Sequence, residues 1–127
     1  MNEKKILIVE DDQLIRYVFE EGFENAGYTV KTAEHAEQAL DILKQDDAIQ
    51  VMFLDLNLPG MNGIELCKII KKDNPLSTVY AVTGFVSIFE LSNCLEAGFD
   101  DYFTKPVNLD VLLKAAQRAF EKTDMSL

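Results

Sequence analysis

Short apolar runs and longer segments with regularly spaced apolar residues alternate along this chain. Most of the runs are rich in β-branched side chains, which is typical of strands buried on both faces of a sheet. One segment, residues 28–32, instead alternates apolar and polar positions. The pattern predicts strands at residues 6–9, 28–32, 51–54, 79–82 and 102–104.

Between these runs, apolar residues recur every three or four positions, which is the period of one helix face. The spacing predicts helices at residues 13–26, 36–43, 64–72, 88–97 and 108–121. Gly27 and Gly98 are expected to end two of them, and Asn108 to cap the start of the last. In the fourth helix the face expected to meet the core carries Ile88, Leu91 and Leu95. The apolar residues at helical spacing in the first helix are Leu14, Ile15, Val18, Phe19 and Phe23.

Five strand–helix units in succession predict an α/β fold, a doubly wound parallel sheet with helices on both faces. The chain contains no internal repeat, low-complexity tract or linker, so residues 1–127 are expected to form a single domain. In such sheets ligands bind beyond the carboxyl ends of the strands. Candidate functional residues are therefore those that directly follow each strand.

The composition and net charge of the chain argue against some classes of binding partner. Apolar residues make up 48% and charged residues 27%, with a formal net charge of −10. Binding to nucleic acid or to an anionic membrane needs clustered Lys and Arg, so neither is expected as a direct partner. No apolar run is long enough for a signal peptide or a membrane span, which favours a cytoplasmic location. Cys67 and Cys94 show no metal-binding or redox spacing and are expected to be buried free thiols.

Polar residues follow four of the predicted strands, and all should meet at one rim of the sheet. They are Glu10-Asp11-Asp12, Asp55, Thr83-Gly84 and Lys105-Pro106. Crowded carboxylates repel one another unless a cation compensates, and Lys105 alone cannot neutralise the group. Oxygen ligands of this kind favour a hard divalent ion, with Mg²⁺ the best candidate. A carboxylate beside such a cation and a lysine is also a competent nucleophile toward phosphorus.

Each of these residues also has a purely structural interpretation. An acid after a strand is often only the N-cap of the following helix, and Asp12 fits that description. A single Asp or Thr at a strand end is usually a turn residue, and a single Lys is usually a surface residue. The signal is therefore the joint placement of acids, Thr and Lys at the ends of the first, third, fourth and fifth strands.

Taken in order, four motifs resemble the response-regulator receiver family of two-component signalling. They are residues 9–12 (VEDD), 54–63 (LDLNLPGMNG), 82–84 (VTG) and 101–106 (DYFTKP). The resemblance covers essentially the whole chain and implies a flavodoxin-like sheet with strand order 2-1-3-4-5. Receivers are themselves a standard example of that order, so the order is taken from the family and is not worked out from the pattern.

The resemblance implies a role for each site residue. Asp55 would accept phosphate from a histidine kinase or a histidine phosphotransfer protein, and Thr83 and Lys105 would bind the phosphoryl oxygens. The residues implied for Mg²⁺ are Glu10, Asp11, Asp55 and the backbone carbonyl of Asn57. Thr83 and Tyr102 would form a switch that remodels the face of the fourth helix, fifth strand and fifth helix for a downstream protein. Pro106 would follow a cis peptide bond. Such a chain would not be an enzyme beyond its own phosphorylation and dephosphorylation.

Three features are individual to this chain. A side chain in place of Gly84 would be expected to crowd the entry to Asp55. Phe85 lies where the family controls the approach of water, so slow hydrolysis of the phosphorylated form is one hypothesis. Phe85 and Phe89 together would also suit a partner-binding patch, although a locally buried pair explains them nearly as well.

Three other classes compete. A flavodoxin-like FMN protein would need a Ser/Thr/Gly-rich phosphate loop after the first strand, where Glu10 and the two acids after it would repel phosphate. An aspartate-based phosphohydrolase usually has a second Asp two residues after the nucleophile, where this chain has Asn57. A nucleotide hydrolase would need a Walker-type loop, which is absent. A receiver that only binds partners and is never phosphorylated remains the alternative within the family.

Overall fold

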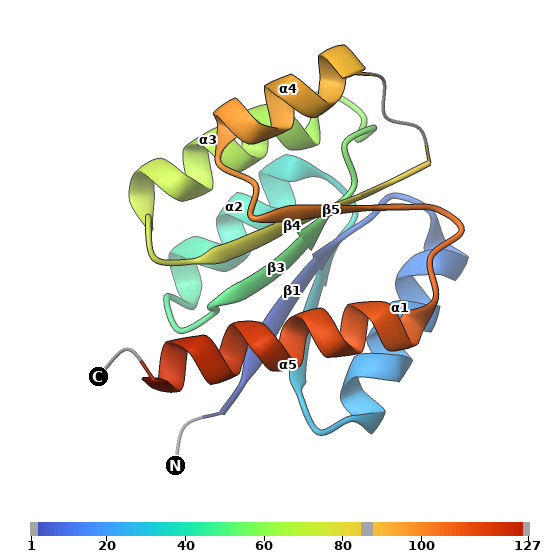
Figure 1. Cartoon of the computed structure of the whole chain (residues 1–127), viewed down its shortest axis with the longest axis vertical. Coiled ribbons are helices and arrows are strands. Elements are labelled where there is room, and N and C mark those ends of the chain that lie inside the picture. Colours follow the sequence, from blue (N-terminus) through green and yellow to red (C-terminus); the bar gives the residue numbers. More distant parts are fainter. Residues whose placement is uncertain (1–2, 85–87, 126–127) are drawn as a thin grey trace.

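The apolar runs form the centre of a five-stranded parallel sheet (Figure 1). The computed structural model describes residues 3–84 and 88–125. The sheet order is β2-β1-β3-β4-β5, which confirms the order that the family resemblance implied. The strands are β1 (Lys5–Val9), β2 (Thr29–Ala33), β3 (Val51–Leu54), β4 (Thr78–Thr83) and β5 (Asp101–Thr104).

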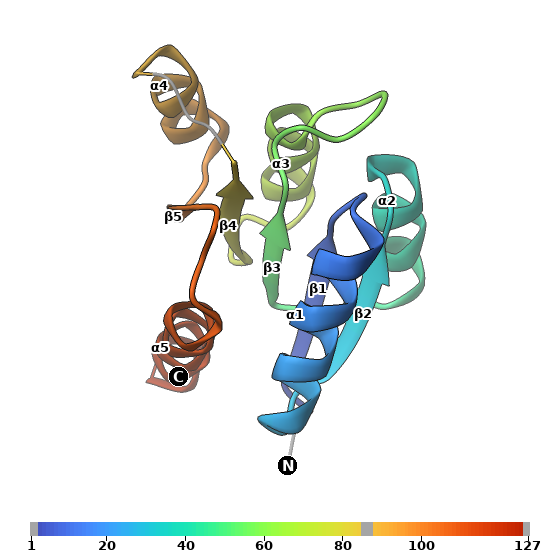
Figure 2. The same cartoon turned by 90° about the vertical axis from the view of Figure 1, so that its right-hand side faces the viewer.

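The helices cover both faces of this sheet, as predicted. Figure 2 shows α1 and α5 on one side and α2, α3 and α4 on the other. Their bounds are α1 (Gln13–Asn25), α2 (Ala36–Gln45), α3 (Gly63–Asp73), α4 (Ile88–Ala97) and α5 (Leu109–Met125). Gly27 and Gly98 both have positive φ, the conformation that favours glycine after a helix end. Asn108 accepts a hydrogen bond from the N–H of Asp110 at the start of α5, as its predicted capping role requires.

The uninterrupted apolar strands are explained by two separate cores. Successive side chains of a strand point to opposite faces. Ile6 and Ile8 of β1 therefore pack under α1 and α5, while Leu7 and Val9 pack under the other three helices. The residues of β3 divide between the same two cores. A strand with helices on both faces has no solvated side, so each of its positions is apolar.

Cys67 of α3 and Cys94 of α4 point into the core on that side of the sheet and are free thiols, as expected. Burial raises the pKa of the Cys67 thiol to about 12, and burial also raises the pKa of Cys94. Both thiols therefore stay protonated and pack as small apolar groups. None of the helices in residues 3–84 and 88–125 is long and apolar enough to cross a bilayer.

One predicted core position, Leu95, is wrong, and two of the regularly spaced apolar residues of α1 lie outside the core. Leu14 and Val18 of α1 are 70% and 46% exposed, and Leu95 of α4 is 71% exposed. Both α1 and α4 carry two neighbouring apolar stripes, and only one stripe of each helix can face the sheet. In α1 the inward stripe includes Phe19 and Phe23, and in α4 it includes Cys94 and Ala97, so the other stripe points to solvent.

The two stripes of α1 should contribute very differently to stability. Phe23 is fully buried and contacts Phe53 with ring centroids 5.1 Å apart. Phe23→Ala is expected to lower the free energy of unfolding by about 3–5 kcal/mol, because it leaves a cavity. Leu14→Ala, in the same helix, is the control and should cost about 0.5 kcal/mol or less. Urea unfolding measures both, and equal costs would contradict this assignment of the two faces.

Candidate functional site at the carboxyl edge of the sheet

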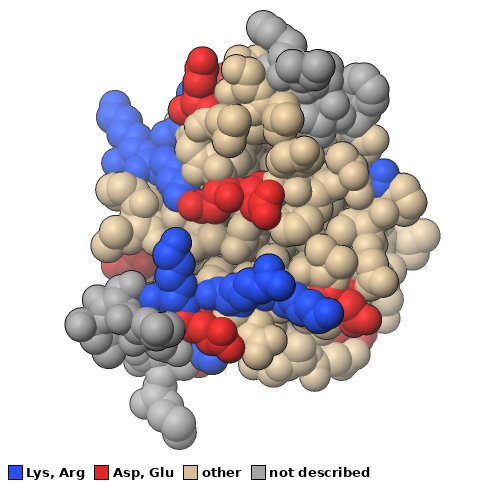
Figure 3. Space-filling model, viewed as in Figure 1, with Lys and Arg blue, Asp and Glu red and all other residues tan. Residues whose placement is uncertain are grey.

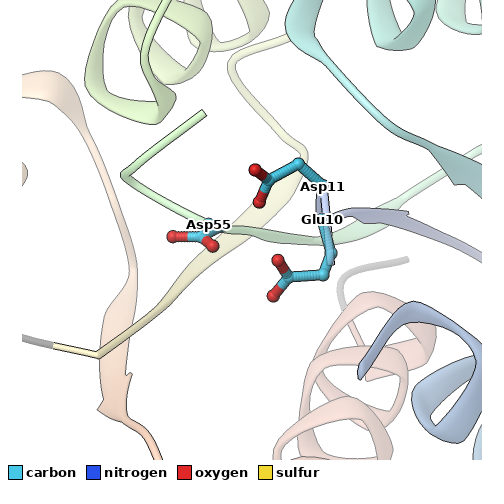
Figure 4. Close-up of side chains that lie close together, drawn as sticks. All are labelled: Glu10, Asp11 and Asp55. Atoms are coloured by element: carbon cyan, nitrogen blue, oxygen red, sulfur yellow. The ribbon is translucent and has the colours of Figure 1, made fainter. Parts of the chain in front are cut away.

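The residues that follow β1 and β3 meet at one edge of the sheet. Figure 4 shows the carboxylates of Glu10, Asp11 and Asp55 gathered there. One oxygen from each lies within 4.8 Å of the other two. The parallel pairing of β1 with β3 explains this, because Val9 lies opposite Leu54 and the two strands end side by side.

The three acidic residues that follow β1 differ in their surroundings. Glu10 is 2% exposed, and its backbone N–H continues the sheet by donating to the carbonyl of Ala33. Asp11 is exposed and completes the carboxylate group. Asp12 caps α1, and its side chain accepts hydrogen bonds from the N–H groups of Leu14 and Ile15. The structural interpretation of Asp12 is therefore correct.

Asp55 is held on both of its oxygens. It is 6% exposed, and its backbone N–H donates to the carbonyl of Val9 at 2.9 Å. Oδ1 accepts from the backbone N–H of Asn57 at 2.9 Å. Oδ2 accepts from Nζ of Lys105 at 3.1 Å. The carboxylate therefore has a fixed direction, toward the rim that it shares with the two acids of β1.

Lys105 joins the fifth strand end to this group. Its Nζ also donates to Oε1 of Glu10 at 2.5 Å. Its backbone N–H donates to the carbonyl of Thr83 at 2.7 Å, which fixes the chain beyond β5 against the end of β4. The Lys105–Pro106 peptide bond is cis, in agreement with the expectation from the sequence.

Thr83 and Asn57 complete the site. Thr83 is fully buried, and its hydroxyl accepts a hydrogen bond from the side-chain amide of Asn57 at 3.4 Å. Tyr102 lies on β5 with its side chain partly exposed. A Cβ placed on Gly84 would meet no atom within 4 Å, so a single carbon there crowds none of the described residues. Phe85 and the side chain of Phe89 lie outside the part of the chain that the structure describes.

The charges of the site are unbalanced. Burial raises the pKa of Glu10 to about 7, and the nearby Asp55 adds to the rise, although hydrogen bonds from Lys105 and the N–H of Asp12 oppose it. Burial lowers the pKa of Lys105, but its hydrogen bonds to Glu10 and Asp55 outweigh this and the pKa is raised. In the described part of the chain, the ammonium of Lys105 thus pairs with two carboxylates of a group of three. The donor set, oxygen atoms with excess negative charge, fits a hard divalent cation.

Gly63, at the start of α3, lies against the backbone of Asp55. A Cβ at this position would lie 2.2 Å from the carbonyl oxygen of Asp55 and 2.9 Å from Cα of Leu56. The N–H of Gly63 donates to the carbonyl of Leu56 at 3.1 Å. The glycine therefore lets the loop after β3 fold back closely, which sets where Asp55 points.

Two contributors to the site were not predicted. Gly63 was included only as the last residue of the 54–63 motif and was given no role of its own, since spacing does not reveal a close backbone approach. Arg16 was not singled out, yet its guanidinium donates to the carbonyl oxygen of Glu10 at 2.8 Å. It lies one helical turn after Asp12, and no motif marks that position.

Comparison with known proteins agrees with this geometry. The family model of the response regulator receiver domain matches residues 6–117. The chain therefore belongs to the receiver family of two-component response regulators, which supports a role in phosphorylation-dependent signalling.

Individual relatives show how the domain is used elsewhere. The chain is 38% identical over 107 residues to a cyclic di-GMP phosphodiesterase of Thermotoga maritima, covering 84% of this chain and 28% of that protein. It is 36% identical over 108 residues to the transcriptional regulatory protein YrkP of Bacillus subtilis, covering 85% and 46%. It thus spans less than half the length of either relative.

Solved structures match over nearly the whole chain. A CheY-like receiver domain protein from Methanospirillum hungatei superimposes with a TM-score of 0.90 at 32% identity, covering 98% of this chain and 100% of that one. The BeF3-activated DrrB receiver domain gives a TM-score of 0.84 at 34% identity, covering 94% and 99%.

The close approach of Gly63 can be tested by adding one carbon. Gly63→Ala places a Cβ against backbone atoms that cannot rotate away, so the loop that carries Asp55 must move. We expect a loss of about 2 kcal/mol or more in unfolding free energy. Gly84→Ala, whose Cβ meets nothing, is the matched control and should stay within about 0.5 kcal/mol. Urea unfolding compares the two, and similar midpoints would refute the close approach.

Proposed function

We propose that Asp55 accepts a phosphoryl group from the phosphohistidine of a histidine kinase or a histidine phosphotransfer protein. The observation that carries the proposal is the fixed, buried carboxylate of Asp55 beside Lys105 and two further acids. A carboxylate with this orientation is a positioned nucleophile. The membership of the receiver family supports the same role.

The transfer conserves atoms and charge in a simple way. An oxygen of Asp55 forms a bond to phosphorus, and the bond from phosphorus to the imidazole nitrogen breaks. The electron pair of that bond stays on the nitrogen, which takes up a proton from water, so the imidazole leaves as the neutral ring. Lys105 holds positive charge next to the phosphoryl oxygens. Glu10, Asp11, Asp55 and the backbone carbonyl of Asn57 would hold Mg²⁺, which when bound offsets the negative charge of the carboxylates and the phosphoryl group.

Thr83 and Tyr102 would transmit the change. The Thr83 hydroxyl leaves its contact with Asn57 to donate to a phosphoryl oxygen, and Tyr102 turns into the space that opens. Large apolar side chains are exposed on α4, β5 and α5, namely Leu95, Tyr102 and Val111. Figure 3 views this face, where basic side chains run along α5 and an acidic group lies between α5 and α4. An apolar face with charges of both signs suits a downstream protein partner.

The phosphodonor protein must cover the rim around Asp55, and an apolar groove adjoins it. The groove has a volume of about 480 Å³ and lies between α1 and the loop after β5. Its lining includes the exposed side chains of Leu14 and Val18 together with Lys105, Pro106 and Val107. Lys105 belongs both to this groove and to the site, so a protein seated in the groove would bring its histidine to Asp55.

The deciding experiment is incubation with acetyl phosphate and Mg²⁺, followed by intact mass measurement. We expect a gain of one phosphoryl group in the wild type and none in Asp55→Asn, because the amide is not a nucleophile toward phosphorus. We also expect no gain after removal of divalent metal. Lys105→Ala should react slowly, since it loses the cation beside the phosphoryl oxygens.

A negative result has a definite meaning here. If the wild type gains no mass and beryllofluoride with Mg²⁺ leaves its NMR spectrum unchanged, the chain is not a phosphorylated receiver. It would then act as a binding module that works without phosphorylation. If Asp55→Asn still gains a phosphoryl group, another residue is the acceptor and the assignment of Asp55 is wrong.

The groove predicts a difference between protein and small-molecule donors. Leu14→Ser and Val18→Ser remove apolar surface that a protein donor would bury, at about 1.5–3 kcal/mol for each side chain. Transfer from a phosphorylated histidine protein should therefore slow by about tenfold or more. Phosphorylation by acetyl phosphate, which is too small to use the groove, should stay within about twofold. Equal slowing with both donors would mean that these variants disturb the site itself.

Leu76→Ser provides the matched control for the groove. Leu76 is exposed too, but it precedes β4 and so lies at the opposite end of the sheet from Asp55. Leu76→Ser should leave the rate of phosphorylation unchanged with both the protein donor and acetyl phosphate. If it slowed the protein donor as much as Leu14→Ser, general surface polarity rather than the groove would explain the loss.

A further inference from the structure

Arg16 is a largely buried cation that the proposed function leaves without a role. Its side chain is 14% exposed, although Leu14, Tyr17 and Val18 of the same helix are open to solvent. One guanidinium nitrogen donates to the backbone carbonyl of Glu10 at 2.8 Å, and the other donates to the carboxylate of Glu34 at 3.1 Å. The side chain therefore links α1 to the ends of β1 and β2.

The contact with Glu10 falls at a critical point of the backbone. The N–H of Glu10 still bonds to β2, but its carbonyl is the first group beyond the β1 ladder. A peptide group is rigid and planar. A hydrogen bond to the carbonyl oxygen of Glu10 therefore also fixes the N–H of Asp11, and with it the direction in which Asp11 leaves the strand.

Two other contacts act on the same turn. The N–H of Asp12 donates to Oε2 of Glu10, and the side chain of Asp12 caps α1. They hold the Glu10 side chain and the start of α1, but neither acts on the peptide group between Glu10 and Asp11. Within residues 3–84 and 88–125, the hydrogen bond to that peptide's oxygen comes from Arg16 alone.

We propose that Arg16 is a positioning residue that orients Glu10 and Asp11 for a divalent cation without touching the cation. The inference rests on the metal site of the proposed function. Groups that hold metal ligands in place from behind commonly change metal affinity by about 10- to 100-fold when removed. Arg16 fits that description, because it acts on the backbone that carries two of the three carboxylates.

A positioning role and a purely electrostatic role of Arg16 predict opposite changes in Mg²⁺ affinity when the side chain is removed. If Arg16 acted only through its positive charge, it would repel a divalent cation, and its removal would tighten binding. If it acts by fixing the Glu10–Asp11 peptide, its removal weakens binding in spite of the lost repulsion. The direction of the change in affinity therefore separates the two explanations.

The test is a titration of the full chain with Mg²⁺ alone, followed through the backbone amide NMR signals of residues 10–12. We expect Arg16→Ala to bind Mg²⁺ about tenfold more weakly than the wild type. Arg16→Lys keeps the charge and one donor but loses the planar fork, so it should recover part of the affinity. Urea unfolding of each variant establishes that the protein titrated is folded.

Glu34→Gln is the matched control. It removes the exposed ion pair of Arg16 and leaves the bond to the Glu10 carbonyl in place. Exposed ion pairs contribute little, so Mg²⁺ affinity should stay within about twofold. An equal loss in Glu34→Gln would assign the effect to the ion pair and overturn the proposal.

The remaining outcomes are also decisive. Equal or tighter binding by Arg16→Ala, in a folded protein, would overturn the positioning role while leaving the metal site intact. If the wild type itself binds no Mg²⁺, both the metal site and the role of Arg16 are wrong. Weaker binding by Arg16→Ala together with an altered amide signal of Asp11 before any metal is added would support the proposal.

Discussion

The ammonium group of Lys105 is the interaction on which the arrangement of this site depends. It lies 2.5 Å from an oxygen of Glu10 and 3.1 Å from an oxygen of Asp55, and both carboxylates are almost fully buried. A buried carboxylate without a partner costs several kcal/mol. Three strands, β1, β3 and β5, thus end at one shared cation, and the backbone of Lys105 adds β4 through Thr83. A phosphoryl group on Asp55 would change the charge that this one lysine must balance, so the ends of these four strands would be affected.

The order of the strands makes that convergence unavoidable. The strand order reverses between β1 and β3, and at such a switch point two neighbouring strands send their following loops to opposite faces. The ends of β1 and β3 are left uncovered side by side, which is where the carboxylates lie. The close contact between Gly63 and the Asp55 carbonyl then prevents the loop after β3 from spreading away. The site is a consequence of topology, refined by one glycine and one arginine.

Burial on both faces of the sheet also decides which features could be predicted from the sequence. The strands were predictable because such burial demands apolar residues at every position, and the strand-end acids followed from the fold. The inward face of α1 was predicted less well, because Leu14 and Val18 form a second apolar stripe beside Phe19 and Phe23. Periodicity finds stripes but does not say which one meets the sheet. Gly63 and Arg16 were missed for a related reason, since their roles depend on backbone approaches that exist only after folding.

The exposed stripe of α1 is understandable once charge is considered. The chain carries a net charge of −10, and three of its carboxylates are gathered at the site, so a phosphorylated donor meets electrostatic repulsion on approach. The free energy gained by burying apolar area does not depend on charge, so an apolar surface can offset that repulsion without basic residues near the acidic rim. Leu14 and Val18 supply such a surface beside Lys105. Under the proposed function, the apolar residues that the core does not use are therefore the ones best suited to hold a negatively charged reactant against a negatively charged protein.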